Sequence, residues 1–350
     1  MPASAGRAAR IRVGVAGCGR IARVHLSAPW PGADVVALAD ADPVNLDAAA
    51  RLAPAAARTA DYRDLCTDPE IDAILVCLPS GLHAEAACQA LTNGKALYLE
   101  KPLAIDLAQG REVVEAWRRS GRPAMIGFNC RFHPLVVEMR KRFCDGEIGD
   151  LVGIRSFLSS PAHARPGWKQ TVAAGGGVLL DFASHHVDLA RFLTGREVAD
   201  VLASTQSRNC EEDSASLHLT LSGPGNVTMQ SVFSWTSVLE DRVELIGTRG
   251  SLGYERYTSL AVEQRLAASS VNVRTLLAAR LTSVSPRYAL RKLAAPMREP
   301  SYALAVADFI DSLRTGRPPS PDLDDGLRSL EVIAAARQSA SDGRVVRLAR

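Results

Sequence analysis

Short apolar segments alternate with segments of helical spacing over the first 130 residues. Buried strands need short continuous apolar runs, whereas helices repeat apolar positions every three or four residues. We therefore predict strands at 11–16, 35–39, 73–78, 96–99 and 124–128, and helices ending near 27 and at 80–93 and 106–119. Strands that alternate with helices predict a parallel, doubly wound sheet.

The pattern changes in the second half of the chain. A predicted helix at 134–144 precedes a long strand at 151–159. Alternating apolar and polar residues then predict antiparallel strands separated by glycine-containing turns. These strands are expected at 198–207, 214–221, 226–235, 242–247 and 251–255, and two helices at 301–315 and 323–341 close the chain.

The two patterns predict an α/β protein of two domains, which suits a chain of 350 residues. The first domain is expected at 1–130, with residues 1–10 as a flexible arm, and the second at 131–350. The second contains a basic segment at about 264–298, which has seven Lys and Arg residues and no acidic residue. We interpret this segment as a variable insertion; the alternatives are a site for a substrate diphosphate, or a membrane-surface or oligomer contact.

Composition narrows the function classes. The apolar share of 47% and the charged share of 23% are typical of a soluble globular protein. A net charge of +3 gives no global field that favours nucleic acid, and no apolar run is long enough to span a membrane. The seven cysteines form no Cys-x-x-Cys pair, which argues against a structural zinc site. With no apolar signal core at the start, we expect a cytoplasmic protein without a metal.

A glycine-rich turn follows the first predicted strand and reads Gly17-Cys18-Gly19-Arg20-Ile21-Ala22. In a dinucleotide-binding unit, Gly17 would permit the tight turn and Gly19 would let a pyrophosphate reach the backbone. Arg20 and Ile21 would begin the helix whose N-terminus faces that pyrophosphate. The turn predicts a Rossmann domain that binds a dinucleotide.

Asp40 ends the second predicted strand, at the distance expected for hydrogen bonds to the adenosine ribose hydroxyls. Asp40 and Asp42 would repel a 2′-phosphate, and no arginine follows them directly. NAD is therefore favoured over NADP. The alternative is that Asp40 caps a helix beginning at Pro43.

Ligands of doubly wound sheets bind at the carboxyl ends of the strands. Three further segments fall at such ends, namely 79–83, 100–102 and 129–131, so we place Pro79, His83, Glu100, Lys101 and Asn129 at the cofactor. Lys101 can also donate a hydrogen bond to a substrate oxygen and favour the alkoxide that forms during hydride transfer. The alternative for Lys101 is an ordinary surface cation.

The stretch from Gly175 to Gly195 reads GGGVLLDFASHHVDLARFLTG. Helical spacing from Leu179 would place Asp181, His185 and Asp188 on one face. A carboxylate four residues before a histidine can orient the imidazole as a general base, and the glycines would let a ligand approach the backbone. The alternative is an amphipathic helix with a solvated Asp and His.

The loop before these glycines carries Arg165, Trp168 and Lys169, and is expected to border the substrate pocket. Trp168 could stack on a sugar ring or, equally, pack at a domain interface. We place Arg131, Trp168, Lys169 and Asp188 at the substrate.

The motifs together resemble the Gfo/Idh/MocA family of NAD(P)-dependent oxidoreductases. The similar stretches occur in family order and cover nearly the whole chain: GCGRIA, LPSGLHAE, EKP, GFNCRFHP, GGGVLLDFASHHVDLARFLTG and the C-terminal GRPPSPDLDDGLRSLEVIAAARQSASDGRVVRL. The resemblance implies a Rossmann domain followed by an α/β domain with a large open, mainly antiparallel sheet.

The resemblance also implies site residues and partners. It makes Lys101, Asp181 and His185 the catalytic set, Pro102 a cis-proline, and the second-domain sheet the interface of a homo-oligomer, a dimer or tetramer. Cys130 stands where inositol dehydrogenases of the family commonly have the first of two arginines.

We therefore expect an NAD-dependent dehydrogenase or reductase that transfers a hydride between nicotinamide and a secondary hydroxyl or ketone. The expected substrate is a sugar, cyclitol or nucleotide-linked sugar. His185 would take the hydroxyl proton, although Lys101 could equally be tuned as the principal acid or base. Two alternatives share the motifs: an NAD-assisted, redox-neutral lyase or glycosidase, and a non-catalytic NAD-binding regulator.

Overall fold

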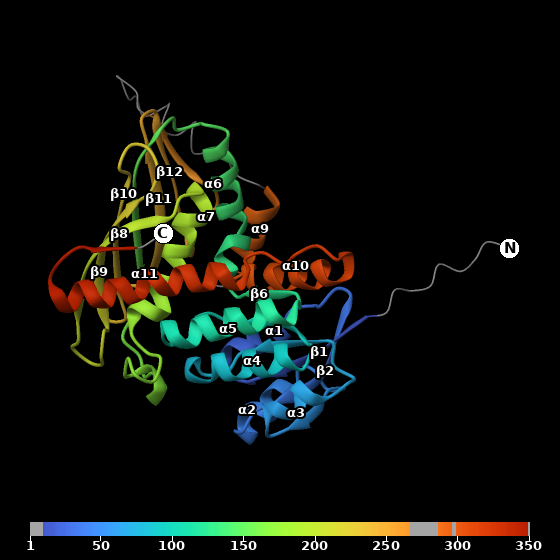
Figure 1. Ribbon diagram of the computed structural model, residues 1–350. Coiled ribbons are helices and arrows are strands. Elements are labelled where there is room, and N and C mark those ends of the chain that lie inside the picture. The colour runs from blue at the N-terminus through green and yellow to red at the C-terminus, as the bar shows by residue number, and fades with distance from the viewer. Residues whose placement is uncertain (1–9, 267–285, 296–298, 349–350) are drawn as a thin grey trace. The chain divides into compact units, whose positions relative to one another are not determined.

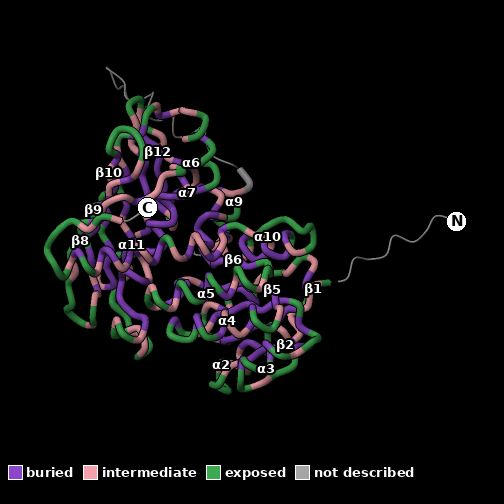
Figure 2. The backbone as a smooth tube through the Cα atoms, viewed as in Figure 1, coloured by how far each residue is buried: buried purple, intermediate pink, exposed green. Residues whose placement is uncertain are grey.

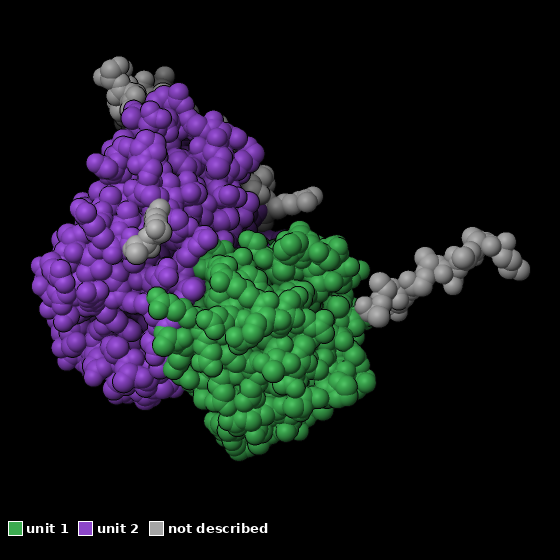
Figure 3. Space-filling view, viewed as in Figure 1, with its two compact units in different colours: residues 1–104, 108–127, 302–326 green, residues 105–107, 128–301, 327–350 purple. Residues whose placement is uncertain are grey.

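The computed structural model describes residues 10–266, 286–295 and 299–348. Most of the predicted arm, and residues 267–285 and 296–298 of the basic segment, lie outside this description. The chain divides into two compact units, coloured separately in Figure 3. The first comprises Met1–Ala104, Ala108–Gly127 and Tyr302–Gly326, and the second comprises Ile105–Leu107, Phe128–Ser301 and Leu327–Arg350.

The first unit is built on a six-stranded parallel sheet in the order β3-β2-β1-β4-β5-β6. The central strands β4 and β5 are buried along their whole length, which explains their continuous apolar sequences. The predicted doubly wound sheet is confirmed. The strands are β1 (Ile11–Ala16), β2 (Ala33–Ala39), β3 (Ala57–Thr59), β4 (Ala73–Val76), β5 (Ala96–Leu99) and β6 (Ala124–Ile126).

Local capping fixes where several helices of this unit begin. The Asp42 carboxylate accepts a hydrogen bond from Val44 N at 2.9 Å, and Pro43 occupies the first helical position of α2. Asp61 caps α3 in the same way. The helices are α1 (Arg20–Leu26), α2 (Pro43–Ala50), α3 (Tyr62–Thr67), α4 (His83–Thr92) and α5 (Leu107–Ser120), with a 3₁₀ turn at Ser80–Leu82 before α4.

Helix α10 (Ser301–Thr315) supplies apolar cover to this unit late in the chain. Phe309 lies edge-on to Tyr98 of β5, with ring centroids 5.6 Å apart, and Tyr302 lies edge-on to His25 of α1 at 5.4 Å. The predicted division into 1–130 and 131–350 stays a prediction. The compact units add that the chain returns to the first of them at residues 302–326.

The second unit contains an eight-stranded sheet in the order β13-β12-β11-β7-β10-β9-β8-β14 (Figure 1). Neighbouring strands are antiparallel except β7 and β10, which pair in parallel. This confirms the expected mainly antiparallel sheet. The strands are β7 (Leu151–Ser159), β8 (Val198–Gln206), β9 (Ser214–Leu221), β10 (Thr228–Ser234), β11 (Glu240–Gly247), β12 (Gly250–Glu255), β13 (Glu263–Leu266) and β14 (Val346–Arg347).

The helices of the second unit include α7, which is buried on nearly all sides (Figure 2). It ends at Gly195, whose φ of 68° gives a left-handed C-terminal stop. The helices are α6 (Pro134–Cys144), α7 (Ser184–Thr194), α9 (Pro286–Ala294) and most of α11 (Leu323–Asp342), with 3₁₀ turns at Asn129–Phe132 and Gly167–Lys169 and a π-helical turn at Leu179–Ala183.

All seven cysteines are free thiols. None of the helices in the described part of the chain combines the length and the apolar character needed to cross a bilayer.

Candidate active site

The glycine turn of the first unit leaves open space beside Gly19, at the start of α1. Gly17 has φ of +88°, and a Cβ there would lie 2.7 Å from backbone atoms of Cys77, so only glycine fits. At Gly19 a Cβ would meet no atom within 4 Å. Because no side chain caps α1, the backbone N–H groups at its first turn, including those of Arg20 and Ile21, suit a dinucleotide pyrophosphate.

Both carboxylate oxygens of Asp40 accept backbone hydrogen bonds, one of them from this turn. Its Oδ2 accepts from Cys18 N at 2.7 Å and its Oδ1 accepts from Asp42 N at 2.8 Å. Each oxygen keeps a second lone pair that a ribose hydroxyl can use. The residue that caps α2 is Asp42, which removes the capping alternative for Asp40.

His83 joins the loops that follow β4 and β5. Its Nδ1 lies 2.6 Å from Pro102 O and its Nε2 lies 2.9 Å from Leu78 O. The ring is buried beside the loop that begins at Pro79, and burial lowers the pKa of His83. Both ring nitrogens thus face backbone carbonyls, of which a neutral ring can donate to one, so the side chain holds the backbone at Pro102, next to Lys101. The Lys101–Pro102 bond is cis, as the resemblance implied.

Glu100 is buried and directed toward α1. Its Oε1 lies 2.7 Å from Nε2 of His25, and both side chains are nearly inaccessible. Gly127 packs against the same carboxylate, because a Cβ there would come within 3.0 Å of its carbon. Glu100 therefore anchors the backbone before Lys101 to the helix that follows the glycine turn.

In the second unit, the space around the glycine triplet is filled by the protein itself. A side chain on Gly176 would collide with the backbone oxygen of Lys169, and one on Gly177 would collide with the Glu212 carboxylate. The prediction that these glycines make room for a ligand is therefore wrong at both positions. Arg337 of α11 holds this loop by binding Glu212 at 3.0 Å and Gly176 O at 3.1 Å.

The predicted helix from Leu179 begins with a π-helical turn, which the sequence pattern did not reveal, and becomes α-helical at Ser184. Asp181 lies in the π-helical turn, and His185 and Asp188 lie in α7. Asp181 Oδ2 accepts from Lys169 Nζ at 2.8 Å, and both side chains are partly exposed. The same ammonium lies 5.3 Å from the Trp168 ring centroid, so the structure brings Trp168, Lys169 and Asp181 together.

Asp188 and Arg131 form a buried ion pair. The guanidinium donates from Nε to Asp188 Oδ2 at 2.9 Å, with a second bond from Nη2 to Oδ1. Phe192 lies under the guanidinium, 5.2 Å from its carbon to the ring centroid. Each charge is already balanced by the other, as in a structural ion pair. The substrate contacts expected of these two residues stay predictions.

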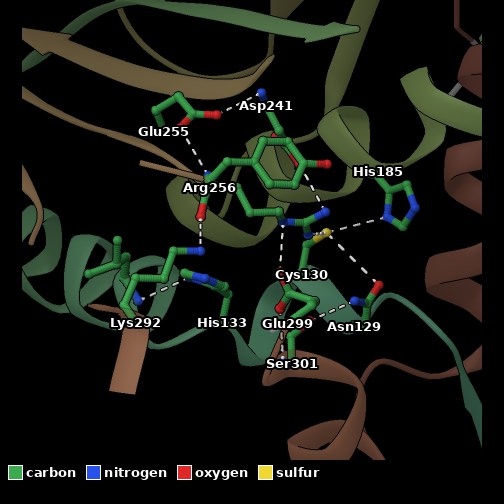
Figure 4. A network of polar contacts seen from close by, with 12 residues as sticks. Asn129, Cys130, His133, His185, Asp241, Glu255, Arg256, Lys292, Glu299 and Ser301 are labelled. Carbon is green, nitrogen blue, oxygen red and sulfur yellow. Dashed lines mark hydrogen bonds and ion pairs between the residues drawn. The ribbon is translucent and has the colours of Figure 1, made fainter. Parts of the chain in front are cut away.

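A buried polar network in the second unit contains residues that sequence reasoning missed (Figure 4). Arg256, directly after β12, donates to the Cys130 sulfur and pairs with Asp241 at 2.9 Å and with Glu299 at 3.2 Å. Asp241 also lies 3.0 Å from His186 Nε2. Burial alone would raise the pKa of Asp241, but Arg256 and His186 hold this pKa well below its usual range.

This network reaches His185 through Cys130. The Cys130 sulfur lies 3.5 Å from Nδ1 of His185, and burial raises the pKa of the thiol to about 12, so it is protonated at neutral pH. Asn129, expected at the cofactor, donates from Nδ2 to Ser301 Oγ at 2.6 Å. The adjacent histidines 185 and 186 are the one sequence signal for this network; nothing near Arg256 marks it.

Comparison with known proteins is consistent across the chain. Residues 11–128 match an oxidoreductase family with an NAD-binding Rossmann fold, and residues 136–253 match the GFO/IDH/MocA C-terminal domain. An inositol 2-dehydrogenase of Rhizobium meliloti (strain 1021) is 28% identical over 97% of this chain and 99% of its own length. A scyllo-inositol 2-dehydrogenase (NAD(+)) of Bacillus subtilis (strain 168) is 26% identical over 97% and 96%.

The fold matches that of a solved relative. The WlbA dehydrogenase of Bordetella pertussis, in complex with NADH and UDP-GlcNAcA, aligns with a TM-score of 0.82 at 23% identity, covering 97% of this chain and 98% of that one. With both domain types of one family matched in order, the chain belongs to the Gfo/Idh/MocA family of NAD-binding oxidoreductases.

Proposed function

We propose that the protein is an NAD-dependent dehydrogenase that interconverts a secondary hydroxyl and a ketone on a sugar or cyclitol. The observation that carries the proposal is the placement of His185, whose Nδ1 faces Cys130 within the buried network. We therefore assign Nε2 to the substrate oxygen. The relatives named as inositol dehydrogenases support a polyol substrate, and the WlbA complex keeps nucleotide-linked sugars in the test panel.

The cofactor preference follows from Asp40. Its carboxylate is fixed beside the glycine turn, where it can accept from ribose hydroxyls and would repel a 2′-phosphate. The N–H groups at the start of α1 would hold the pyrophosphate. Bound NAD would supply the hydride acceptor or donor. Pro79, His83, Glu100 and Asn129 are proposed to support this site, with His83 and Glu100 acting through the backbone on either side of Lys101.

In the direction of oxidation, His185 takes the proton of the substrate hydroxyl. Lys101 donates a hydrogen bond to the same oxygen and stabilises its developing negative charge. Asp181, whose charge is shared with Lys169, accepts a hydrogen bond from a neighbouring hydroxyl, and Trp168 offers an apolar face to the ring. In reduction, His185 returns the proton.

The outer face of the second-unit sheet supports a homo-oligomer. Leu202 of β8 and Val232 of β10 point to the same face, and each is 41% exposed. Such apolar side chains on an open sheet suit contact with another copy of the chain. We propose that the protein is cytoplasmic and forms a homo-oligomer. Light scattering on the purified protein would test the oligomer by measuring its mass.

The function is tested by following nicotinamide absorbance with NAD and a panel of free sugars, cyclitols and nucleotide-diphosphate sugars. We expect turnover of at least one free polyol, and a loss of roughly 100-fold or more in His185→Ala and Lys101→Ala, both of which should still bind NAD. Substrate conversion without net NADH would instead indicate the redox-neutral chemistry. NAD binding with no conversion of any compound would contradict the dehydrogenase.

A further inference from the structure

The imidazole of His185 has to present an unprotonated Nε2 if it is to accept a proton from a hydroxyl. A neutral imidazole carries one hydrogen, and the partner of the other nitrogen decides where that hydrogen lies. In this protein the partner of Nδ1 is a thiol, Cys130, at 3.5 Å. A thiol can donate or accept, so the groups around the sulfur decide which tautomer it stabilises.

Two neighbours fix the thiol. Arg256 is a donor only, so its contact with the sulfur uses a lone pair of Cys130. Asn129 donates from Nδ2 to Ser301 Oγ at 2.6 Å, which turns its Oδ1 toward Cys130 at 3.9 Å. The S–H group therefore points to Asn129, and the remaining sulfur lone pair faces Nδ1 of His185.

We propose that Asn129, Cys130 and Arg256 are positioning residues that fix His185 in the tautomer with hydrogen on Nδ1 and a lone pair on Nε2. This inference rests on the proposed function, in which Nε2 receives the substrate proton. It assigns to Asn129 a role in orienting the base, and it explains why a buried cysteine lies between an arginine and a histidine (Figure 4).

Arg256 is itself held by residues from several other elements, so its contact with the Cys130 sulfur is fixed by the surrounding fold. Its guanidinium is paired with Asp241 on β11 and with Glu299 before α10, and its backbone oxygen accepts from Lys292 Nζ of α9 at 2.9 Å. Asp241 is bound in turn by His186. The charges acting on the Cys130 thiol from these elements are those of Arg256, Asp241 and Glu299.

The experiment reads the tautomer directly, without turnover. The ¹⁵N shifts of the imidazole nitrogens are measured in histidine-labelled protein, with His185→Gln used to assign the His185 signals. We expect the wild type to show hydrogen on Nδ1. Asn129→Leu removes the acceptor of the thiol hydrogen. The S–H group of Cys130 would then donate to Nδ1 of His185, and the ring hydrogen of His185 would lie on Nε2.

Cysteine variants separate positioning from packing. Cys130→Ser keeps a group that can donate and accept, so we expect the wild-type tautomer and polyol oxidation within roughly 3-fold of wild type. Cys130→Ala removes the partner of Nδ1, and we expect mixed tautomers with kcat lowered roughly 10-fold or more at unchanged NAD affinity. Cys66→Ala, at a buried cysteine of α3 in the first unit, is the matched control and should change neither readout.

A charged variant adds a pH test. Cys130→Asp places a carboxylate against Nδ1, which stabilises the imidazolium and should raise the pKa of His185, measured from the same ¹⁵N signals. Arg256 would offset part of this shift but not reverse it. Arg256→Lys keeps the buried positive charge beside Asp241 and Glu299, so it tests the contact with the sulfur without removing that charge.

The outcomes distinguish this inference from the proposed function. Hydrogen on Nε2 in the wild type, or the same tautomer in wild type, Asn129→Leu and Cys130→Ala, would overturn it even if polyols are oxidised. The expected tautomers without oxidation of any polyol would support the positioning of His185 and contradict the dehydrogenase.

Discussion

His133 shows how one buried histidine makes stability depend on pH. Its Nδ1 accepts from Leu135 N at 3.2 Å and so caps α6, while its ring stacks on Tyr254 with centroids 5.7 Å apart. Burial lowers the pKa of His133 to about 4; Arg256 and Lys292 also lower it, while Glu299 and Asp241 partly oppose the shift. Because Nδ1 is the cap acceptor, the native state needs the neutral ring.

We therefore predict that stability falls as the pH is lowered from about 6.5 to about 4. In this window the unfolded chain binds a proton at His133 that the native protein does not, which lowers the free energy of unfolding by up to about 3 kcal/mol. His133→Asn keeps a capping side chain but cannot titrate. Urea unfolding at several pH values should give a flatter profile for the variant, and parallel profiles would contradict the assignment.

The residue contacts of the site were the least predictable feature of the sequence. Lys101, Asp181 and His185 could be picked out because they lie in recognisable motifs, whereas Arg256 is 126 positions from the thiol it contacts. Cys130 lies in the turn before α6 and Arg256 directly follows β12, so the packing of α6 against β12 brings these distant residues together. The same holds for Glu100, whose partner His25 lies in a helix with no polar motif of its own.

At the scale of elements, the glycine triplet is a packing device that places Lys169 opposite Asp181. Gly176 has no room for a Cβ because the Lys169 backbone oxygen fills that space. Arg337 and Glu212 clamp the loop from the other side, so it cannot easily move away. A substitution here must therefore displace the loop that carries the partner of Asp181.

We predict that Gly176→Ala destabilises the protein by roughly 2 kcal/mol or more and lowers activity, because a well-packed backbone must shift. Gly167→Ala, in the same loop, is the control: its Cβ would meet no atom within 4 Å, so it should change stability by less than about 0.5 kcal/mol. Thermal unfolding of both variants tests this. Equal melting temperatures would show that the loop accommodates a Cβ at Gly176, and would contradict the prediction.

The sequence located most elements well where the pattern is strong. The strands at 96–99, 151–159 and 214–221 and the helices at 134–144 and 301–315 were predicted with the observed bounds, because apolar runs are bracketed there by turn or capping residues. The short, largely exposed β3 and the two-residue β14 were missed, since neither has an apolar run. The π-helical turn, which contacts β7 and β10 of the sheet, was also missed.

At the scale of the whole molecule, the glycine turn, Asp40 and the strand order together define the cofactor class. The chain is a member of a family with an NAD-binding Rossmann fold, and we propose that the choice between NAD and NADP rests on the Asp40 carboxylate. Asp40 holds the turn at Cys18 N, and we propose that it also accepts from the ribose hydroxyls. The whole-molecule consequence is that NAD, but not NADP, should stabilise the native state.

We predict that NAD raises the melting temperature of the wild type, because NAD at 100 times its Kd stabilises the native state by about 2.7 kcal/mol. NADP should have a much smaller effect. Asp40→Ser removes the charge that repels a 2′-phosphate and one ribose acceptor, so the ratio of the two dissociation constants should move toward NADP by roughly 10-fold or more. Asp34→Ser is the matched control, because this aspartate of β2 is exposed and pairs with Arg10 at 2.8 Å. If the ratio of the NAD and NADP dissociation constants stays the same in Asp40→Ser, the selectivity does not come from Asp40. A similar change in Asp40→Ser and Asp34→Ser would indicate a general effect of altering strand β2.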